Sequence, residues 1–143
     1  MRAITVRQPW AWQIINQRKN IENRTRNIAG KYRGPVAIHA ALKPDQEALA
    51  RLPMHAPEWV TALRVFDYGV ILGVVDLVDV HEAMGSFCPQ SCRPWGESAG
   101  VWHLVLANPR PIPLNQQPRV RGALGLWTLP EDVAAHVEVL TRG

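Results

Sequence analysis

Residues 17–24 read QRKNIENR, and this stretch decides how the rest of the chain is interpreted. Its alternation of apolar and polar residues predicts a short strand with Glu22 and Arg24 on one face and with Lys19 at the turn just before it. Glu22 is the only acidic residue among the first 44, which carry nine lysines and arginines. The stretch therefore predicts a cationic site in which Glu22 either only organises the cations around it or also contacts a ligand.

The charge of the chain is unevenly divided. Residues 1–44 carry nine cations and one anion, a net charge of +8, whereas residues 45–143 carry seven cations and eleven anions, a net charge of −4. Arginine supplies 13 of the 16 cations, and its planar guanidinium binds phosphate and stacks on bases. This asymmetry indicates a cationic face for an anionic partner such as nucleic acid. The alternative is a solvated basic face that aids solubility.

Length and hydropathy limit the class of protein. A chain of 143 residues is expected to form one domain, over residues 1–143, with its own core. The longest apolar run, Val70–Val75, is too short to cross a bilayer, so we expect no membrane association. The first residues lack the pattern of a signal peptide. These features predict a cytoplasmic protein, or a nuclear one in a eukaryote, and leave its oligomeric state open.

The two cysteines, Cys88 and Cys92, are separated by three residues in a loop rich in Pro, Ser and Gly. Two cysteines do not make a disulfide scaffold. His81 and His103 are the nearest histidines, but the spacing of the four fits no common zinc pattern. We therefore expect free thiols, no metal and no other cofactor.

Periodicity and turn signals predict a series of strands with few helices between them. Such an order is typical of an α+β domain, a mixed or antiparallel β-barrel with flanking helices. A long loop is expected over residues 82–100 and a proline-rich extended stretch over 108–118. The predicted strands cover residues 3–7, 20–25, 36–40, 68–80, 101–106 and 122–129, and the predicted helices cover residues 10–16, 45–52, 58–64 and 130–140.

The chain resembles the ASCH domain, named for homology to activating signal cointegrator 1 and related to the PUA domains of RNA-modifying systems. The resemblance covers nearly the whole chain. The family motif is G-x-K-x-x-E-x-R, and Gln17 stands where the family usually has Gly, which puts the local turn geometry in question. The matching segments are residues 8–11 (QPWA), 19–24 (KNIENR), 33–40 (RGPVAIHA), 69–76 (GVILGVVD), 102–106 (WHLVL), 108–110 (NPR) and 125–127 (GLW).

The resemblance implies a PUA-like β-barrel with a cleft that accepts nucleic acid, RNA in preference to DNA, or a modified nucleoside. Glu22 would orient Arg24 and accept a hydrogen bond from a base amino group, the pairing expected for cytosine N4. A structural alternative is that Glu22 only pairs with its neighbours to close a buried corner. The residues expected to line the nucleic-acid-binding cleft are Trp10, Lys19, Glu22, Arg24, Arg33, His39, Trp95 and His103.

Hydrolysis in the same cleft is the alternative function. One bacterial branch of the family hydrolyses N4-acetylcytidine with a Lys, a Thr three residues later and a distant Glu. Lys19 aligns with that Lys, but Glu22 stands at the Thr position, so Lys19 and Glu22 would be the catalytic acid/base pair. A ribonuclease would instead use His39 or His103 as general base. A protein-interaction module remains a third reading, through Trp59 or residues 108–118.

Overall fold

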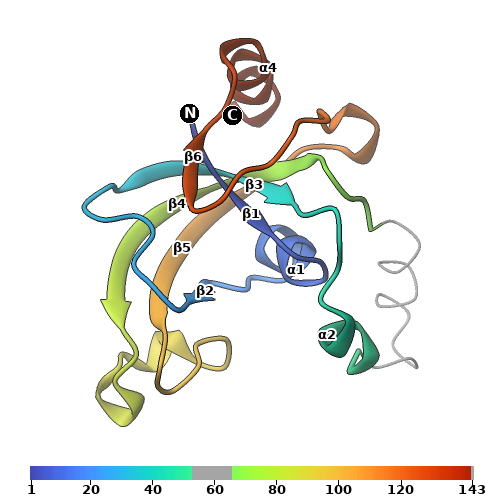
Figure 1. Cartoon of the computed structure of the whole chain (residues 1–143). Helices are drawn as coiled ribbons and strands as arrows, with labels where there is room; N and C mark the ends of the chain where they lie inside the picture. The colour runs from blue at the N-terminus through green and yellow to red at the C-terminus, as the bar shows by residue number, and fades with distance from the viewer. Residues whose placement is uncertain (53–65, 143) are drawn as a thin grey trace.

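One six-stranded mixed sheet organises the computed structural model, which describes residues 1–52 and 66–142. The strand order is β2-β5-β4-β3-β1-β6, and every neighbouring pair is antiparallel except β1 and β3. The sheet curls into a half-barrel (Figure 1), which confirms the predicted α+β class. The strands are β1 (Arg2–Val6), β2 (Ile21–Arg24), β3 (Gly34–Ala40), β4 (Ile71–Glu82), β5 (Trp102–Pro111) and β6 (Leu126–Thr128).

The curl of the sheet follows from irregularities in its two longest strands. The register of β4 against β5 shifts at Val74/Asp76 and again at Leu77/Asp79, and such bulges bend a strand and increase its twist. Gly73 lies where β5 packs tightly against β4, since a Cβ there would meet the Arg110 carbonyl oxygen at 2.5 Å. The long β4–β5 ribbon can therefore wrap around the helix packed inside it.

Helices cover both faces of the sheet (Figure 1). Helix α1 (Trp10–Asn16) lies in the concave face, and α4 (Glu131–Thr141) packs on the opposite face. Neighbouring residues of β1 point to opposite faces of the sheet: Ile4 belongs to the core cluster under α1, and Ala3 belongs to the cluster under α4. This burial on both sides explains why the central strands are almost continuously apolar.

Shorter elements complete the described chain. Helix α2 (Gln46–Ala50) begins after Asp45, whose carboxylate accepts the Ala48 amide and caps the helix. Three 3-10 turns follow, η1 (Gly85–Phe87), η2 (Gln90–Cys92) and η3 (Leu114–Gln116). None of the helices in residues 1–52 and 66–142 is long and apolar enough to cross a membrane.

Most predicted elements are present, with three differences. Strand β5 runs to Pro111 rather than ending at residue 106, so part of the proline-rich stretch is strand, and β6 is shorter than predicted. The left-handed residue after α1 is Arg18, with a φ of 56°, whereas Gln17 has a φ of −125°. The predicted helix over 58–64, with Trp59, lies outside the described residues.

Candidate functional site

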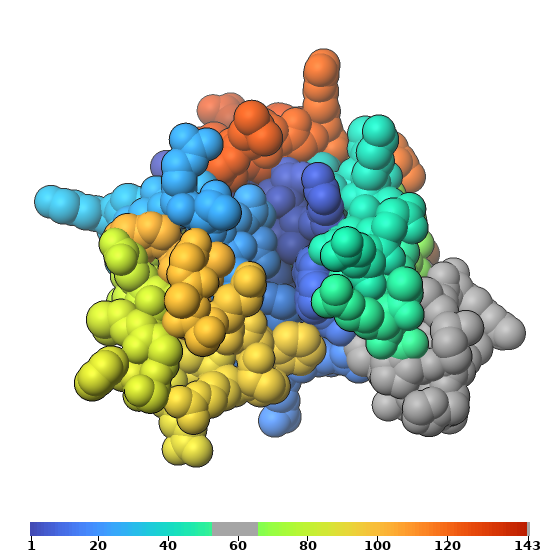
Figure 2. Space-filling view, turned by 60° about the horizontal axis from the view of Figure 1, so that its bottom comes forward, coloured from blue at the N-terminus to red at the C-terminus, as the bar shows by residue number. Residues whose placement is uncertain are grey.

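A groove crosses the molecule beside the first turn of α1 and strand β2. It consists of three cavities of about 570, 360 and 740 Å³ that share lining residues: Trp10 and Glu22 join the first to the second, and Thr5 and Leu124 are among those that join the second to the third. In the space-filling view a hollow opens over dark-blue N-terminal residues, between the green segment that contains α2 and the yellow β4–β5 loop (Figure 2). We refer to these three cavities together as the groove.

Lys19 lies in the wall of the groove and is almost completely buried, with 3% of its side chain exposed. Its ammonium donates to the Ile21 carbonyl and lies 3.7 Å from Glu22 Oε1. The nitrogen also lies 5.5 Å from the centre of the Trp10 ring and 5.8 Å from that of Trp95. Burial lowers the pKa of Lys19, and the Glu22 carboxylate opposes that shift.

Glu22 joins the two cations of the motif, as the alternation predicted. Arg24 Nε donates to Glu22 Oε2 at 2.8 Å, and Arg24 Nη2 donates to the Thr5 carbonyl at 2.8 Å. The pair thereby connects β2 to β1, two strands that are not neighbours in the sheet. The arrangement positions the Glu22 carboxylate at the junction of the first two cavities.

The two tryptophans that the sequence placed in the site come from distant segments. Trp10 begins α1, and its Nε1 donates to the Asp45 carboxylate at 3.1 Å. Trp95 belongs to the β4–β5 loop, and its carbonyl accepts from the Asn23 side chain at 3.0 Å, while the Glu97 amide donates to Asn23 Oδ1. Both rings line the 570 Å³ cavity and are only partly buried, so both offer surface for stacking.

His39 forms part of the lining of the 740 Å³ cavity, where its hydrogen bonds are satisfied within the protein. Its Nε2 lies 2.8 Å from the Val120 carbonyl and its Nδ1 lies 3.1 Å from Thr5 Oγ1, which also accepts from Trp127 Nε1. A carbonyl only accepts, so Nε2 carries the proton and Nδ1 accepts from the threonine hydroxyl. Burial lowers the pKa of His39. This histidine is held as a neutral, positioned ring.

Two other predicted site residues lie away from the groove. The guanidinium of Arg33 donates to the carbonyls of Gly30 and Tyr32 and is exposed, outside the lining of the three cavities. Its charge acts instead on Asp79. His103 is buried on β5 opposite His81. Neither residue is placed to contact a ligand in the groove.

The groove also contains cations that the motif did not indicate. Arg51 lines its first cavity, Arg7 the second, and Arg119 and Arg121 the third. The last two flank Val120, whose carbonyl binds His39. Three of the four, Arg51, Arg119 and Arg121, had little signal in the sequence, because they belong to residues 45–143, whose net charge is negative.

One further group of side chains gathers at the far end of the β4–β5 ribbon. A nitrogen or sulfur atom from each of His81, Cys88, Cys92 and His103 lies within 4.8 Å of all the others. Their sequence spacing did not predict this, because the cluster depends on the pairing of β4 with β5, which sets His81 opposite His103. We call these four residues the His/Cys cluster.

The curled mixed sheet with helices on both faces defines a PUA-like α+β domain. The family model for the ASCH domain matches residues 4–114, and the chain therefore belongs to the ASCH domain family. It is similar in fold to the crystal structure of ASCH from Zymomonas mobilis, with a TM-score of 0.53 and 13% identity over 98% of this chain and 94% of that chain. No curated protein matches the chain.

Proposed function

We propose that the groove binds a single-stranded or modified nucleic-acid segment, RNA in preference to DNA. The observation that carries the proposal is the Lys19 ammonium, held beside Glu22 and within 6 Å of both the Trp10 and Trp95 rings. Partly buried aromatic rings next to a fixed carboxylate and cations are the combination with which proteins receive an unstacked base.

The carboxylate of Glu22 supports base recognition as well as local structure. Oε2 is engaged by Arg24 at 2.8 Å, but Lys19 lies a longer 3.7 Å from Oε1. Each carboxylate oxygen accepts about two hydrogen bonds, so the group retains capacity for a donor from the groove. An exocyclic amine such as cytosine N4 is the donor that a carboxylate reads.

The arginines along the groove support binding of the backbone. From the first cavity to the third the lining includes Arg51, Arg7, Arg24, Arg119 and Arg121. Arg119 is 70% exposed in its side chain, as a group that contacts phosphates must be. Phosphate contacts of this kind position a strand without reading its sequence, which leaves the choice of base to the Glu22 end.

A fluorescence-anisotropy titration with a short labelled single-stranded RNA tests the proposal. We expect binding whose affinity falls steeply as salt increases, because phosphate contacts release counterions. Trp95→Ala should weaken binding about tenfold, the loss of roughly one stacked base. Lys19→Met should weaken it by a similar factor, because the cation beside Glu22 and the two rings is lost. Lys31→Met is the matched control, because Lys31 is exposed and lies outside the groove lining. Circular dichroism confirms that each variant is folded.

Absence of binding by the wild-type protein at low salt would refute the proposal. Equal losses in Lys31→Met and Lys19→Met would show attraction by net charge alone. The same titration with single-stranded DNA of matching sequence tests the preference for RNA.

Hydrolysis of an acylated nucleoside in the groove is a second candidate, favoured by the burial of Lys19, whose side chain is only 3% exposed. The buried environment lowers the pKa of Lys19, which favours the neutral amine that acid/base catalysis requires. Incubation with free N4-acetylcytidine should then release acetate and cytidine, and Lys19→Met should abolish the release. Retention of the nucleoside without turnover would leave the groove as a binding site only.

A further inference from the structure

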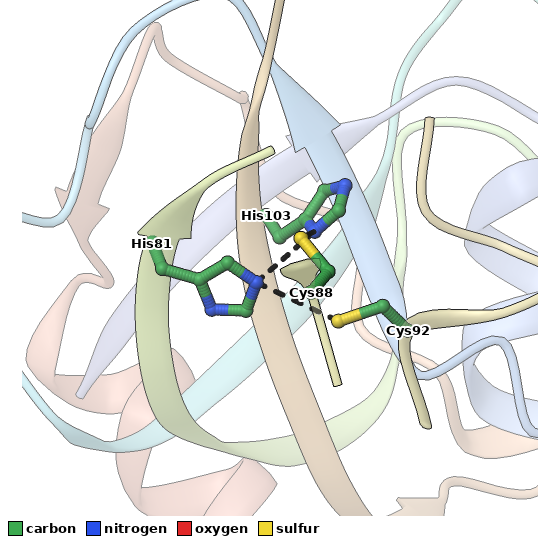
Figure 3. A group of neighbouring side chains, drawn as sticks. All are labelled: His81, Cys88, Cys92 and His103. Carbon is green, nitrogen blue, oxygen red and sulfur yellow. Dashed lines mark hydrogen bonds between the residues drawn. The ribbon is translucent and has the colours of Figure 1, made fainter. Parts of the chain in front are cut away.

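We infer that the His/Cys cluster is a structural zinc site that fixes the β4–β5 loop. Figure 3 shows the four side chains directed toward one another, His81 from β4, His103 from β5 and the two cysteines from the loop between them. Two thiolates and two imidazoles are a ligand set typical of tetrahedral zinc. The inference rests on this cluster alone and is independent of what the groove binds.

The distances between the ligand atoms fit a single ion. His81 Nε2 lies 3.1 Å from His103 Nδ1 and 3.5 Å from Cys92 Sγ, and Cys88 Sγ lies 3.9 Å from His103 Nδ1. A tetrahedral zinc with ordinary bond lengths sets its N and S ligands about 3.3–3.8 Å apart. The remaining pairs of ligand atoms lie within 4.8 Å, so shifts of about 1 Å would complete the coordination.

Each histidine has one ring nitrogen that faces the cluster, His81 Nε2 or His103 Nδ1, and an outer nitrogen that faces away from it. A hydrogen bond donated by the outer nitrogen leaves the nitrogen that faces the cluster available as a ligand. His81 Nδ1 lies 2.8 Å from the Asp79 carboxylate, and His103 Nε2 lies 2.6 Å from the Glu97 carbonyl. Both partners accept hydrogen bonds, so the outer nitrogens carry the protons. Zinc-bound histidines usually donate their outer N–H to a carboxylate or carbonyl partner of this kind.

The same hydrogen bonds create a problem that a cation resolves. With the outer nitrogens protonated, His81 Nε2 and His103 Nδ1 direct lone pairs at each other across 3.1 Å. An ion bound between them satisfies both lone pairs at once. The Cys88 sulfur also accepts a hydrogen bond from the Met84 amide N–H at 3.1 Å. Such a bond stabilises the thiolate form that binds zinc.

The β4–β5 loop has little else to hold it in place, so a metal link would stabilise it. Of residues 83–101, all within the described part of the chain, only Cys92 is buried, and Phe87 is 87% exposed. A segment with so little apolar burial cannot offset the entropy of its own ordering, and metal ligands supply that free energy in small folds. Gly96 permits the close packing, since a Cβ there would meet the His103 ring at 2.9 Å.

With four protein ligands the site is closed, which is the arrangement of structural and not of catalytic zinc. The loop that it would fix carries Trp95 and Glu97, both on the wall of the groove. By fixing this loop, zinc would hold the wall of the groove that contains Trp95 and Glu97 in position.

Metal analysis of the full chain tests the inference. Protein purified without chelator and dialysed against trace zinc should contain about one zinc per chain, and the Cys88→Ser/Cys92→Ser double variant should contain almost none. His136→Gln is the control, because His136 is exposed on α4. Cobalt(II) in place of zinc should give the strong visible absorption of a tetrahedral, thiolate-bound ion.

A second pair of variants tests the site without removing a ligand. Asp79→Asn should weaken zinc affinity by about tenfold or more, the usual effect of losing a carboxylate that accepts from a zinc-bound histidine. Competition with a chromogenic chelator measures the affinity. Glu82→Gln removes an exposed carboxylate from the same strand and should leave the affinity unchanged. Equal affinities for all three proteins would overturn the role of Asp79 and, with it, the tautomer argument.

Three results would overturn the zinc site itself: no stoichiometric metal in the reduced wild-type protein, stoichiometric iron or copper in its place, or zinc retained by the double cysteine variant. A Cys88–Cys92 disulfide in freshly purified protein, measured by thiol titration after denaturation, would also overturn it.

Discussion

At the scale of single residues, the central feature is a positive charge enclosed by aromatic rings. Lys19 has 3% of its side chain exposed and Glu22 has 10%, so neither charge is stabilised much by water. Each depends on the other and on local donors and acceptors: the Ile21 carbonyl for the ammonium and Arg24 for the carboxylate. Such a pair is costly to break, because removal of one partner leaves a buried charge uncompensated.

We expect Glu22→Gln to lower the free energy of unfolding by about 3 kcal/mol, the usual cost of breaking a buried ion pair. Glu47→Gln is the matched control, because it breaks an exposed ion pair: the side chain of Glu47 is 86% exposed and that of its partner Arg51 is 78% exposed. This substitution should lower the free energy of unfolding by less than about 1 kcal/mol. Urea unfolding monitored by tryptophan fluorescence measures both. Similar losses in the two variants would show that Glu22 is not a partner of Lys19 in the folded state.

At the scale of elements, the turn between α1 and β2 depends on one left-handed residue. The helix ends at Asn16, and the left-handed conformation needed to redirect the chain falls on Arg18, with a φ of 56°. Arginine adopts that conformation at a cost of about 1 kcal/mol relative to glycine. Gln17, whose turn geometry the sequence pattern put in question, has an ordinary negative φ.

Arg18→Gly should therefore raise the free energy of unfolding by several tenths of a kcal/mol, because glycine enters the left-handed region without strain. Gln17→Gly is the control and should lower it, because glycine there gains only freedom in the unfolded chain. Thermal unfolding of the wild-type protein and the two variants measures these changes in stability. A stabilised Gln17→Gly together with a destabilised Arg18→Gly would contradict the dihedral assignment.

Prediction from sequence succeeded where the determinants are local. Strand alternation set Glu22 and Arg24 on one face, and the two bond at 2.8 Å. The sequence-based prediction failed for the part of β5 beyond residue 106, because prolines argue against a strand interior. Strand β2 pairs with residues 102–105 of β5. Among the described residues no strand pairs with that side of β5 at Pro109 and Pro111, so neither proline interrupts a ladder there.

The remaining misses concern residues brought together by register. His81 and His103 are 22 positions apart and become neighbours only because β4 pairs with β5. Arg33 follows the motif closely in sequence, yet the turn before β3 directs its guanidinium to the Gly30 and Tyr32 carbonyls. A sequence pattern gives the spacing of such residues but not the direction of their side chains.

At the scale of the whole molecule, the fold extends beyond the segment that the family model matches. That match ends at residue 114. Strand β6, which completes the sheet beside β1, and helix α4, which covers one of its faces, both lie after it. Val137 of α4 is completely buried against this second core cluster, while Val139, two residues later, is 63% exposed. If α4 is integral to the domain, these two valines differ greatly in their effect on stability.

We expect Val137→Asp to lower the free energy of unfolding by about 3 kcal/mol or more, because it buries an unpaired carboxylate in an apolar site. Val139→Asp should change it by no more than about 0.5 kcal/mol. Denaturant unfolding of both variants distinguishes an integral helix from an appended one. Equal and small effects would mean that α4 does not stabilise the sheet in solution.

The pairing of β6 with β1 has a consequence for how the chain is made. Strand β1 lies between β3 and β6, and β6 emerges from the ribosome more than a hundred residues after β1. At ordinary translation rates that interval lasts on the order of ten seconds. For that time one edge of β1 has no partner, and the charged Arg2, which in the finished fold donates to the Leu126 carbonyl, opposes pairing of that edge with other nascent chains.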